Sequence, residues 1–160
     1  MASIFKAYDI RGLYPEEINE DIAYEIGRAF VDYLGCKTVV IGRDMRTSSP
    51  AMFEKLSAGI TQQGADIYDV DMSTTDMFYF AVEHLGADAG IMITASHNPG
   101  QYNGLKLVRA HAIPIGGESG IKDIEKIYQA KNFKSSDRQG QIFIKTGILD
   151  AYVKFIHSLV

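Results

Sequence analysis

The sequence predicts an α/β protein, in which a sheet carries helices on both faces. Segments with apolar residues at helical spacing alternate along the chain with short runs of β-branched and aliphatic residues. One of these runs, Gly90–Thr94, shows no polar alternation. Such a run is typical of a central strand that is covered on both faces. Together these observations predict alternating strands and helices around one sheet.

The individual elements follow from local signals. A helix is predicted over 15–34, because its apolar residues share one helical face and Gly35 ends it. A second helix begins at Ser49-Pro50, a capping residue followed by a first-turn proline, and ends at Gly64. The remaining predicted elements are helices 77–85 and 121–128, strands 38–41, 66–70, 90–94 and 105–108, and a surface loop over 131–140.

The C-terminal segment differs from the rest. Apolar residues crowd a predicted helix from Ile148 to Leu159, and no capping glycine follows it. Two interpretations stay open: the helix packs back on this domain, or it opens a further domain that the chain does not contain. We expect one domain over 1–145, and a helix over 146–160 that leads into an absent second domain.

Composition excludes several classes of protein. The 160 residues include 16 basic and 20 acidic side chains, a net charge of −4, which argues against a nucleic-acid or anionic-membrane partner held by bulk charge. The single cysteine, Cys36, can form no internal disulfide, and we expect a structural thiol. No apolar run approaches the roughly 18 residues of a membrane span, and the first residues lack the core of a signal peptide. A cytoplasmic location is therefore predicted.

The densest polar cluster follows the predicted central strand. It begins with Thr94-Ala95-Ser96-His97-Asn98-Pro99-Gly100 and continues through Tyr102-Asn103-Gly104-Leu105-Lys106. In open α/β sheets ligands gather at strand ends. A hydroxyl, an imidazole, an amide and a lysine suit an anion there, and a phosphate in particular. Serine hydrolysis is not favoured, because Ser96 lacks a G-x-S-x-G elbow and its neighbour His97 is badly placed to act as its base.

Two further segments carry arginines beside turns. Arg11 precedes Gly12, and Arg43 and Arg46 flank Asp44 after a predicted strand. The guanidinium fork matches the oxygens of a phosphate. Each arginine taken alone is more simply explained as solvated, or as a structural ion pair with a neighbouring aspartate. Three such loops in one small acidic domain favour an anion site.

Other motifs are weaker. The glycine cluster Gly116–Gly120 lacks the lysine of a Walker loop and is predicted to be a turn with a helix cap. No predicted strand is followed by G-x-G-x-x-G, which disfavours a nucleotide-binding α/β domain. His84, His111 and His157 share no metal-ligand spacing, and we expect ordinary surface or partly buried residues.

The motifs on these loops also carry a family resemblance. Phe5-Lys6-Ala7-Tyr8-Asp9-Ile10-Arg11-Gly12, Gly42-Arg43-Asp44-Met45-Arg46, the Ser-His-Asn-Pro loop and Tyr102–Lys106 resemble, in order and approximate spacing, the first domain of the α-D-phosphohexomutases, in particular bacterial phosphomannomutase/phosphoglucomutase. The resemblance implies a three-layer α/β/α domain with a mixed sheet of about four main strands. It covers residues 5 to 106.

The resemblance also implies catalytic roles. Ser96 would be the phosphorylated serine, whose phosphate transfers to the sugar and helps to hold Mg²⁺. Lys106 would act as a general base or neutralise charge, and His97 would assist proton transfer or contact the phosphate. We expect substrate contacts from four further residues: Tyr8, Arg11, Asn98 and Arg46. Of these, Tyr8 and Arg11 are expected to converge with the three catalytic residues at the strand ends.

The implied reaction is reversible 1,6-phosphoryl transfer on hexose phosphates, with a hexose 1,6-bisphosphate as intermediate and activator. The family's Mg²⁺ loop, Asp-Gly-Asp-x-Asp, does not occur in this sequence. The chain alone is therefore expected to be inactive, and its partners are a phosphosugar and the remaining mutase domains. Thr75-Asp76 stands where the family pattern suggests Thr-Pro, a departure in the loop after the second predicted strand. The alternative function is a free-standing phosphosugar-binding or regulatory module.

Overall fold

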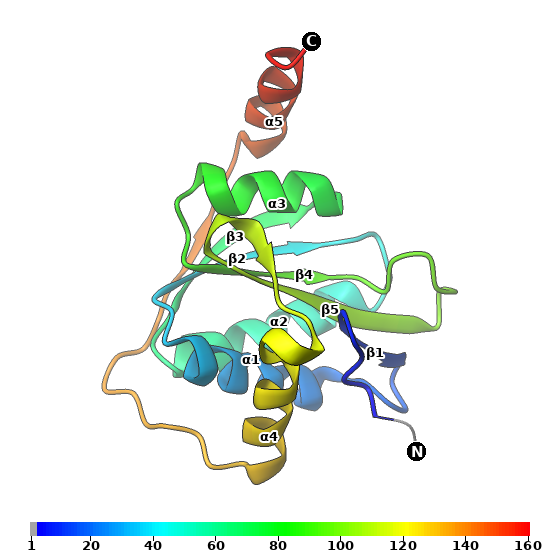
Figure 1. Ribbon diagram of the computed structural model, residues 1–160, viewed down its shortest axis with the longest axis vertical. Helices are drawn as coiled ribbons and strands as arrows, with labels where there is room; N and C mark the ends of the chain where they lie inside the picture. Colours follow the sequence, from blue (N-terminus) through cyan, green and yellow to red (C-terminus); the bar gives the residue numbers. More distant parts are fainter. Residues whose placement is uncertain (1–2) are drawn as a thin grey trace.

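The computed structural model describes residues 3–160 as three layers, with a sheet between two sets of helices (Figure 1). Helices α1 (Glu20–Leu34) and α2 (Ser49–Gln62) cover one face, and α4 (Lys122–Ala130) lies beside α1. Helix α3 (Thr75–His84) covers the other face, and α5 (Ile148–His157) lies beyond α3. This is the predicted α/β/α arrangement.

The sheet is mixed, as predicted. Over the described residues its order is β1-β5-β4-β2-β3-β7, and β6 pairs with β5. The neighbours β4, β2, β3 and β7 run parallel, whereas β5 is antiparallel to β4, β1 and β6. The strands are β1 (Ile10–Leu13), β2 (Thr38–Arg43), β3 (Asp66–Met72), β4 (Ala89–Ile93), β5 (Tyr102–Arg109), β6 (Ile113–Pro114) and β7 (Ile142–Ile144).

The four predicted strands correspond to β2, β3, β4 and β5, and the structure adds three shorter ones. Strands β1, β6 and β7 have 4, 2 and 3 residues. Runs of this length carry too little periodicity to be recognised in a sequence, because their partners in the sheet define them. The stretch 132–141 between α4 and β7 forms neither helix nor strand, which confirms the predicted surface loop.

Capping residues set the helix boundaries. Helix α1 begins later than predicted because the side chain of Asn19 accepts a hydrogen bond from the Ile22 N–H at 3.1 Å, and it ends at Gly35, whose φ is +61°. Helix α3 begins earlier than predicted because Thr74 caps the N–H of Met77 at 3.2 Å. Within residues 3–160 no helix has both the length and the apolar character that a membrane crossing requires.

Two apolar clusters lie on opposite faces of the sheet. The larger one lies under α1 and α2 and includes Phe30, Ile91 and Ile93. The smaller one lies under α3 and includes Phe78 and Met92. Side chains alternate along a strand, so Met92 faces α3 while its neighbours face α1 and α2. The same alternation orients the polar residues at the strand ends.

The C-terminal helix packs back on the domain along one side only. Ile148 is buried, and the ring centroids of Tyr152 and Phe155 lie 5.5 and 5.2 Å from that of Phe80 on α3. Other apolar side chains of this segment stay exposed, among them Val153. The first interpretation of this segment therefore holds for one side of the helix. The domain boundary at residue 145 stays a prediction.

Candidate active site

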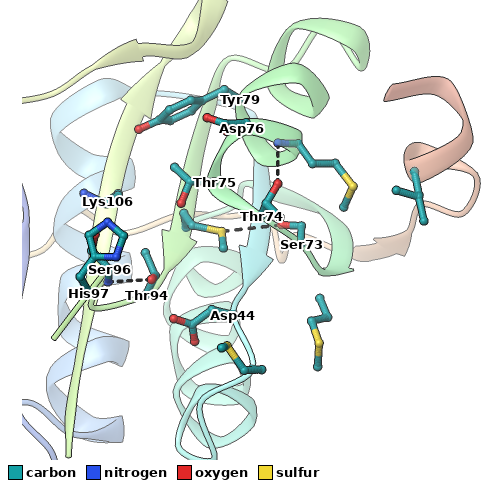
Figure 2. Close-up of a pocket in the computed structure, with 15 residues that line it drawn as sticks. Asp44, Ser73, Thr74, Thr75, Asp76, Tyr79, Thr94, Ser96, His97 and Lys106 are labelled. Carbon is teal, nitrogen blue, oxygen red and sulfur yellow. Dashed lines mark hydrogen bonds between the residues drawn. The ribbon is translucent and has the colours of Figure 1, made fainter. Parts of the chain in front are cut away.

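A cavity of about 770 Å³ lies where the parallel strands β2, β3 and β4 end. The crossover helices α2 and α3 lie on opposite faces of the sheet, so the connections diverge at this edge, where α/β proteins bind ligands. Figure 2 shows Ser96, His97 and Lys106 along one wall, with residues 73–76 and Tyr79 along the other. The predicted catalytic residues thus share one cavity.

Ser96 belongs to the turn formed by residues 94–102, which we call the serine loop. Its backbone has a φ of +56°, and its N–H donates to Thr94 Oγ1 at 2.9 Å. The loop closes through a hydrogen bond from the Tyr102 N–H to the Pro99 carbonyl at 3.0 Å. Ser96 and His97 are both exposed, so the hydroxyl and the imidazole are open to a ligand.

Asn98 points back into the loop. Its Nδ2 donates to the Ala95 carbonyl at 2.8 Å, and its N–H donates to the same oxygen at 3.1 Å. The residue lies against a smaller cavity of about 420 Å³ on the Arg46 side of the loop, which Ser96 and His97 also line. The expected substrate contact from Asn98 would come from this side.

Arg46 has a different environment from the one expected for a substrate contact. Its Nε donates to Asp44 Oδ2 at 3.1 Å, and its four remaining N–H groups donate to backbone carbonyls at 2.8 to 3.0 Å. A guanidinium has five N–H donors, and all five are used within the protein. The side chain is only 10% exposed. The carbonyls are those of Ser96, Asn98, Pro99 and Tyr102.

Lys106 and Arg11 lie on the α3 face of the sheet. Lys106 is paired in register with Met92, and Arg11 with Gly104, so both side chains share a face with Met92. Between the two cations lies the buried carboxylate of Asp9, with its Oδ2 3.8 Å from Arg11 Nη1 and 4.0 Å from Lys106 Nζ. Arg11 is therefore coupled to Lys106 through a shared anion, although it does not line the 770 Å³ cavity.

Tyr8 lies apart from the other predicted site residues. Its side chain is 84% exposed and lines a separate cavity of about 690 Å³, together with Gly116 and Ser119. Within the described residues, the structure thus brings Ser96, His97 and Lys106 into one cavity and places Tyr8 at another.

The second wall of the main cavity is the part that sequence reasoning missed. It includes Asp44 after β2 and residues 73–76 at the start of α3, where Thr75-Asp76 departs from the family pattern. Burial raises the pKa of the Tyr79 phenol, and the nearby Asp76 carboxylate raises it further. The available signal was positional, because both segments directly follow a predicted strand and the ends of parallel strands converge.

The residues that the structure describes do not form a complete metal site. Within residues 3–160, no group of three or more His, Cys, Asp or Glu side chains is arranged to hold a cation. Asp44, which follows β2 and lines the cavity, accepts hydrogen bonds from Arg46 Nε at 3.1 Å and from the Ser49 hydroxyl at 3.0 Å. Mg²⁺ prefers about six oxygen ligands. The oxygen ligands around this cavity could therefore supply only part of the coordination shell of Mg²⁺.

Comparisons with known proteins agree on one family. The family model described as phosphoglucomutase/phosphomannomutase, alpha/beta/alpha domain I, matches residues 2–135. That range contains Ser96, His97 and Lys106. A phosphomannomutase from Escherichia coli strain K12 is 45% identical over 158 residues, which cover 98% of this chain and 34% of the relative. A phosphomannomutase from Klebsiella pneumoniae is 46% identical over 151 residues, 93% of this chain and 96% of its own length.

Solved structures agree as well. A phosphoglucomutase/phosphomannomutase family protein from Burkholderia thailandensis superposes with a TM-score of 0.86 at 35% identity, covering 98% of this chain and 36% of that chain. The chain spans about a third of the length of the first curated relatives it matches.

Proposed function

We propose that this chain, which belongs to the phosphoglucomutase/phosphomannomutase family as its alpha/beta/alpha domain I, carries the phosphoserine of a hexose-phosphate mutase. The observation that carries the proposal is the placement of Ser96. Its hydroxyl is exposed in a 770 Å³ cavity at the carboxyl ends of parallel strands, next to His97 and in the same cavity as Lys106. A phosphoryl carrier needs this combination of access, a proton acceptor and a cation.

In the proposed reaction the phosphoryl group moves between Ser96 and a hexose phosphate. The P–Oγ bond breaks as a new P–O bond forms to a sugar hydroxyl; the hydroxyl proton passes to His97 or to another base, and the departing Ser96 Oγ takes up a proton. In the return step the P–O bond to the other sugar oxygen of the bisphosphate breaks as a P–Oγ bond forms, and the Ser96 hydroxyl proton is transferred through a base to the departing sugar oxygen. Lys106, with its Nζ 4.0 Å from Asp9, supplies positive charge beside the transferring group.

The rim of the cavity supports a multidomain mutase. Met45, Met72 and Leu149 line the cavity and are 79%, 64% and 61% exposed. Large apolar side chains around an open site are typical of a surface that a partner covers. In the proposal the remaining mutase domains close over this rim and exclude water from the transferring phosphoryl group.

Mg²⁺ and a hexose 1,6-bisphosphate belong to the same proposal. A phosphate on Ser96 would supply one or two of the roughly six oxygen ligands that Mg²⁺ prefers. The other ligands would come from outside this chain. The isolated chain is therefore expected to bind Mg²⁺ poorly and to show no mutase turnover, even with bisphosphate present.

A domain exchange tests the proposal. The matching 158-residue segment of the E. coli K12 phosphomannomutase is replaced by this chain, and turnover of mannose 1-phosphate is measured with a coupled assay. This chimera, which we call the exchanged enzyme, is expected to convert mannose 1-phosphate. Ser96→Ala is expected to abolish its turnover, and Ser135→Ala on the exposed loop after α4 is expected to leave its turnover unchanged.

Two results would contradict the proposal. The first is turnover that survives Ser96→Ala. The second is a folded exchanged enzyme without turnover, combined with tight binding of mannose 1-phosphate by the isolated chain in calorimetry. That second result would favour the free-standing phosphosugar-binding module.

A further inference from the structure

Four carbonyl oxygens of the serine loop converge on the side chain of one arginine. The carbonyls of Ser96 and Asn98 accept from Arg46 Nη2, and those of Pro99 and Tyr102 accept from Nη1. The turn has few backbone hydrogen bonds of its own, among them those from the Asn98 N–H to the Ala95 carbonyl and from the Tyr102 N–H to the Pro99 carbonyl. Without the guanidinium, the carbonyls of Ser96, Asn98 and Tyr102 would lose this donor, and the Pro99 carbonyl would keep only its bond from the Tyr102 N–H, which is unfavourable.

The guanidinium is itself fixed to a different strand. Asp44, which follows β2, accepts from Arg46 Nε at 3.1 Å and from the Arg46 N–H at 3.1 Å. The same carboxylate accepts from the hydroxyl of Ser49 on α2 at 3.0 Å. The loop after β4 is thus held by a group whose position is set by β2 and α2.

Ser96 needs such support because of its backbone conformation. Its φ of +56° is left-handed, a conformation that a residue with a Cβ rarely adopts. Such a conformation persists only where surrounding contacts determine it. The structure provides one contact on each side of the residue: the N–H donates to Thr94 Oγ1, and the carbonyl accepts from Arg46.

We propose that Arg46 is a positioning residue, which holds the serine loop so that the Ser96 hydroxyl faces the cavity, and that it makes no contact with substrate. No N–H of its guanidinium remains to bind a phosphate oxygen. The assignment rests on the proposed function, because that function makes Ser96 the reacting residue. Lysine cannot replace arginine here, since an ammonium is a point charge and cannot reach four separated carbonyls.

Hydrogen exchange on the isolated chain tests the structural half of the inference. Arg46→Lys keeps the charge, and NMR reports the exchange of the Ser96, Asn98 and Tyr102 amides. We expect their exchange to accelerate by roughly ten-fold or more, with amides of β4 unchanged. Arg138→Lys is the matched control, because Arg138 likewise binds a carboxylate, Asp66, and a carbonyl, away from the loop. Unchanged loop exchange in Arg46→Lys would overturn the inference.

Kinetics in the exchanged enzyme test the catalytic half. A displaced hydroxyl should lower kcat by about 100-fold for Arg46→Lys, while KM changes by no more than a few-fold. For Arg46→Ala, added guanidinium ion should restore part of kcat. A raised KM with unchanged kcat would instead indicate a direct substrate contact and would overturn the assignment. If the exchanged enzyme without any substitution shows no Ser96-dependent turnover, that separate result counts against the proposed function. The hydrogen-exchange measurement on the isolated chain stays valid in that case.

Discussion

On one face of the sheet two helices of 15 and 14 residues close over the strands, whereas on the other face α3 has only 10 residues. Helices α1 and α2 approach so closely that a Cβ at Gly59 would lie 2.0 Å from the Tyr24 carbonyl oxygen. Helix α3 leaves open the C-terminal end of β4 and the part of β5 that pairs with it, and there Thr94 and Lys106 line the cavity. We call these the closed face and the open face.

The difference shows how one small sheet combines stability with a reactive site. The larger apolar cluster lies on the closed face, where burial contributes most of the folding free energy. The open face carries cations, hydroxyls and carboxylates that need access to a ligand. Substitutions on the closed face should therefore change stability, and substitutions on the open face should change activity.

The largest expected effect comes from Phe30→Ala on the closed face. Phe30 is fully buried, so its truncation should lower the free energy of unfolding by about 4 kcal/mol. Phe80→Ala is the matched control on the outer side of α3, where the half-buried ring contacts Tyr152 and Phe155, and it should cost about 1 kcal/mol. Urea denaturation measures both, and equal losses would contradict the comparison.

The next effect concerns the close contact between α1 and α2. Gly59→Ala should lower the free energy of unfolding by about 2 kcal/mol, because the new methyl group forces the helices apart. Gly100→Ala in the serine loop should change it by less than about 0.5 kcal/mol, since no atom lies within 4 Å of the added Cβ. Thermal melting distinguishes the two, and a stable Gly59→Ala variant would show that the closed face can relax.

A smaller effect on stability is expected from Lys106→Met on the open face. The ion pair with Asp9 is long, at 4.0 Å, and Lys106 is 25% exposed, so the loss should be below about 1 kcal/mol. Turnover of the exchanged enzyme should nevertheless fall about 100-fold or more, as for other lost proton-transfer or charge-stabilising groups. Lys126→Met on α4 serves as the control. Normal turnover in Lys106→Met would reduce Lys106 to a surface residue.

The last effect is absent at neutral pH and concerns the pH dependence of stability at the edge of the sheet opposite the cavity. Burial, and secondarily the Asp88 carboxylate, raises the pKa of the Cys36 thiol from 9.0 to about 12. Between these values the unfolded chain releases a proton that the folded chain retains, so stability falls as the pH rises. Denaturation midpoints should therefore decline more steeply above pH 9 for the unsubstituted chain than for Cys36→Ala. Parallel curves would place the thiol in contact with solvent.

Local patterns were enough to predict much of this protein. Apolar periodicity predicted α1 and α2, because burial of one helix face is recorded in residue spacing, and short runs of β-branched and aliphatic residues predicted the four longer strands. The end of β4 was predicted to carry the polar cluster, and the structure places Ser96 and His97 there. Lys106 shares their cavity because its strand runs antiparallel beside β4, a pairing that periodicity alone did not specify.

Only the tertiary structure decided which partners these side chains have. Arg46 was expected at a substrate, yet four carbonyls and Asp44 take all of its donors. Tyr8 was expected to converge with Ser96 at the strand ends, yet it lines a separate cavity. A sequence determines the donors that a side chain carries and the periodicity of its segment. The acceptor that each donor meets depends on strand order and loop conformation, which place residues distant in the sequence within hydrogen-bonding distance.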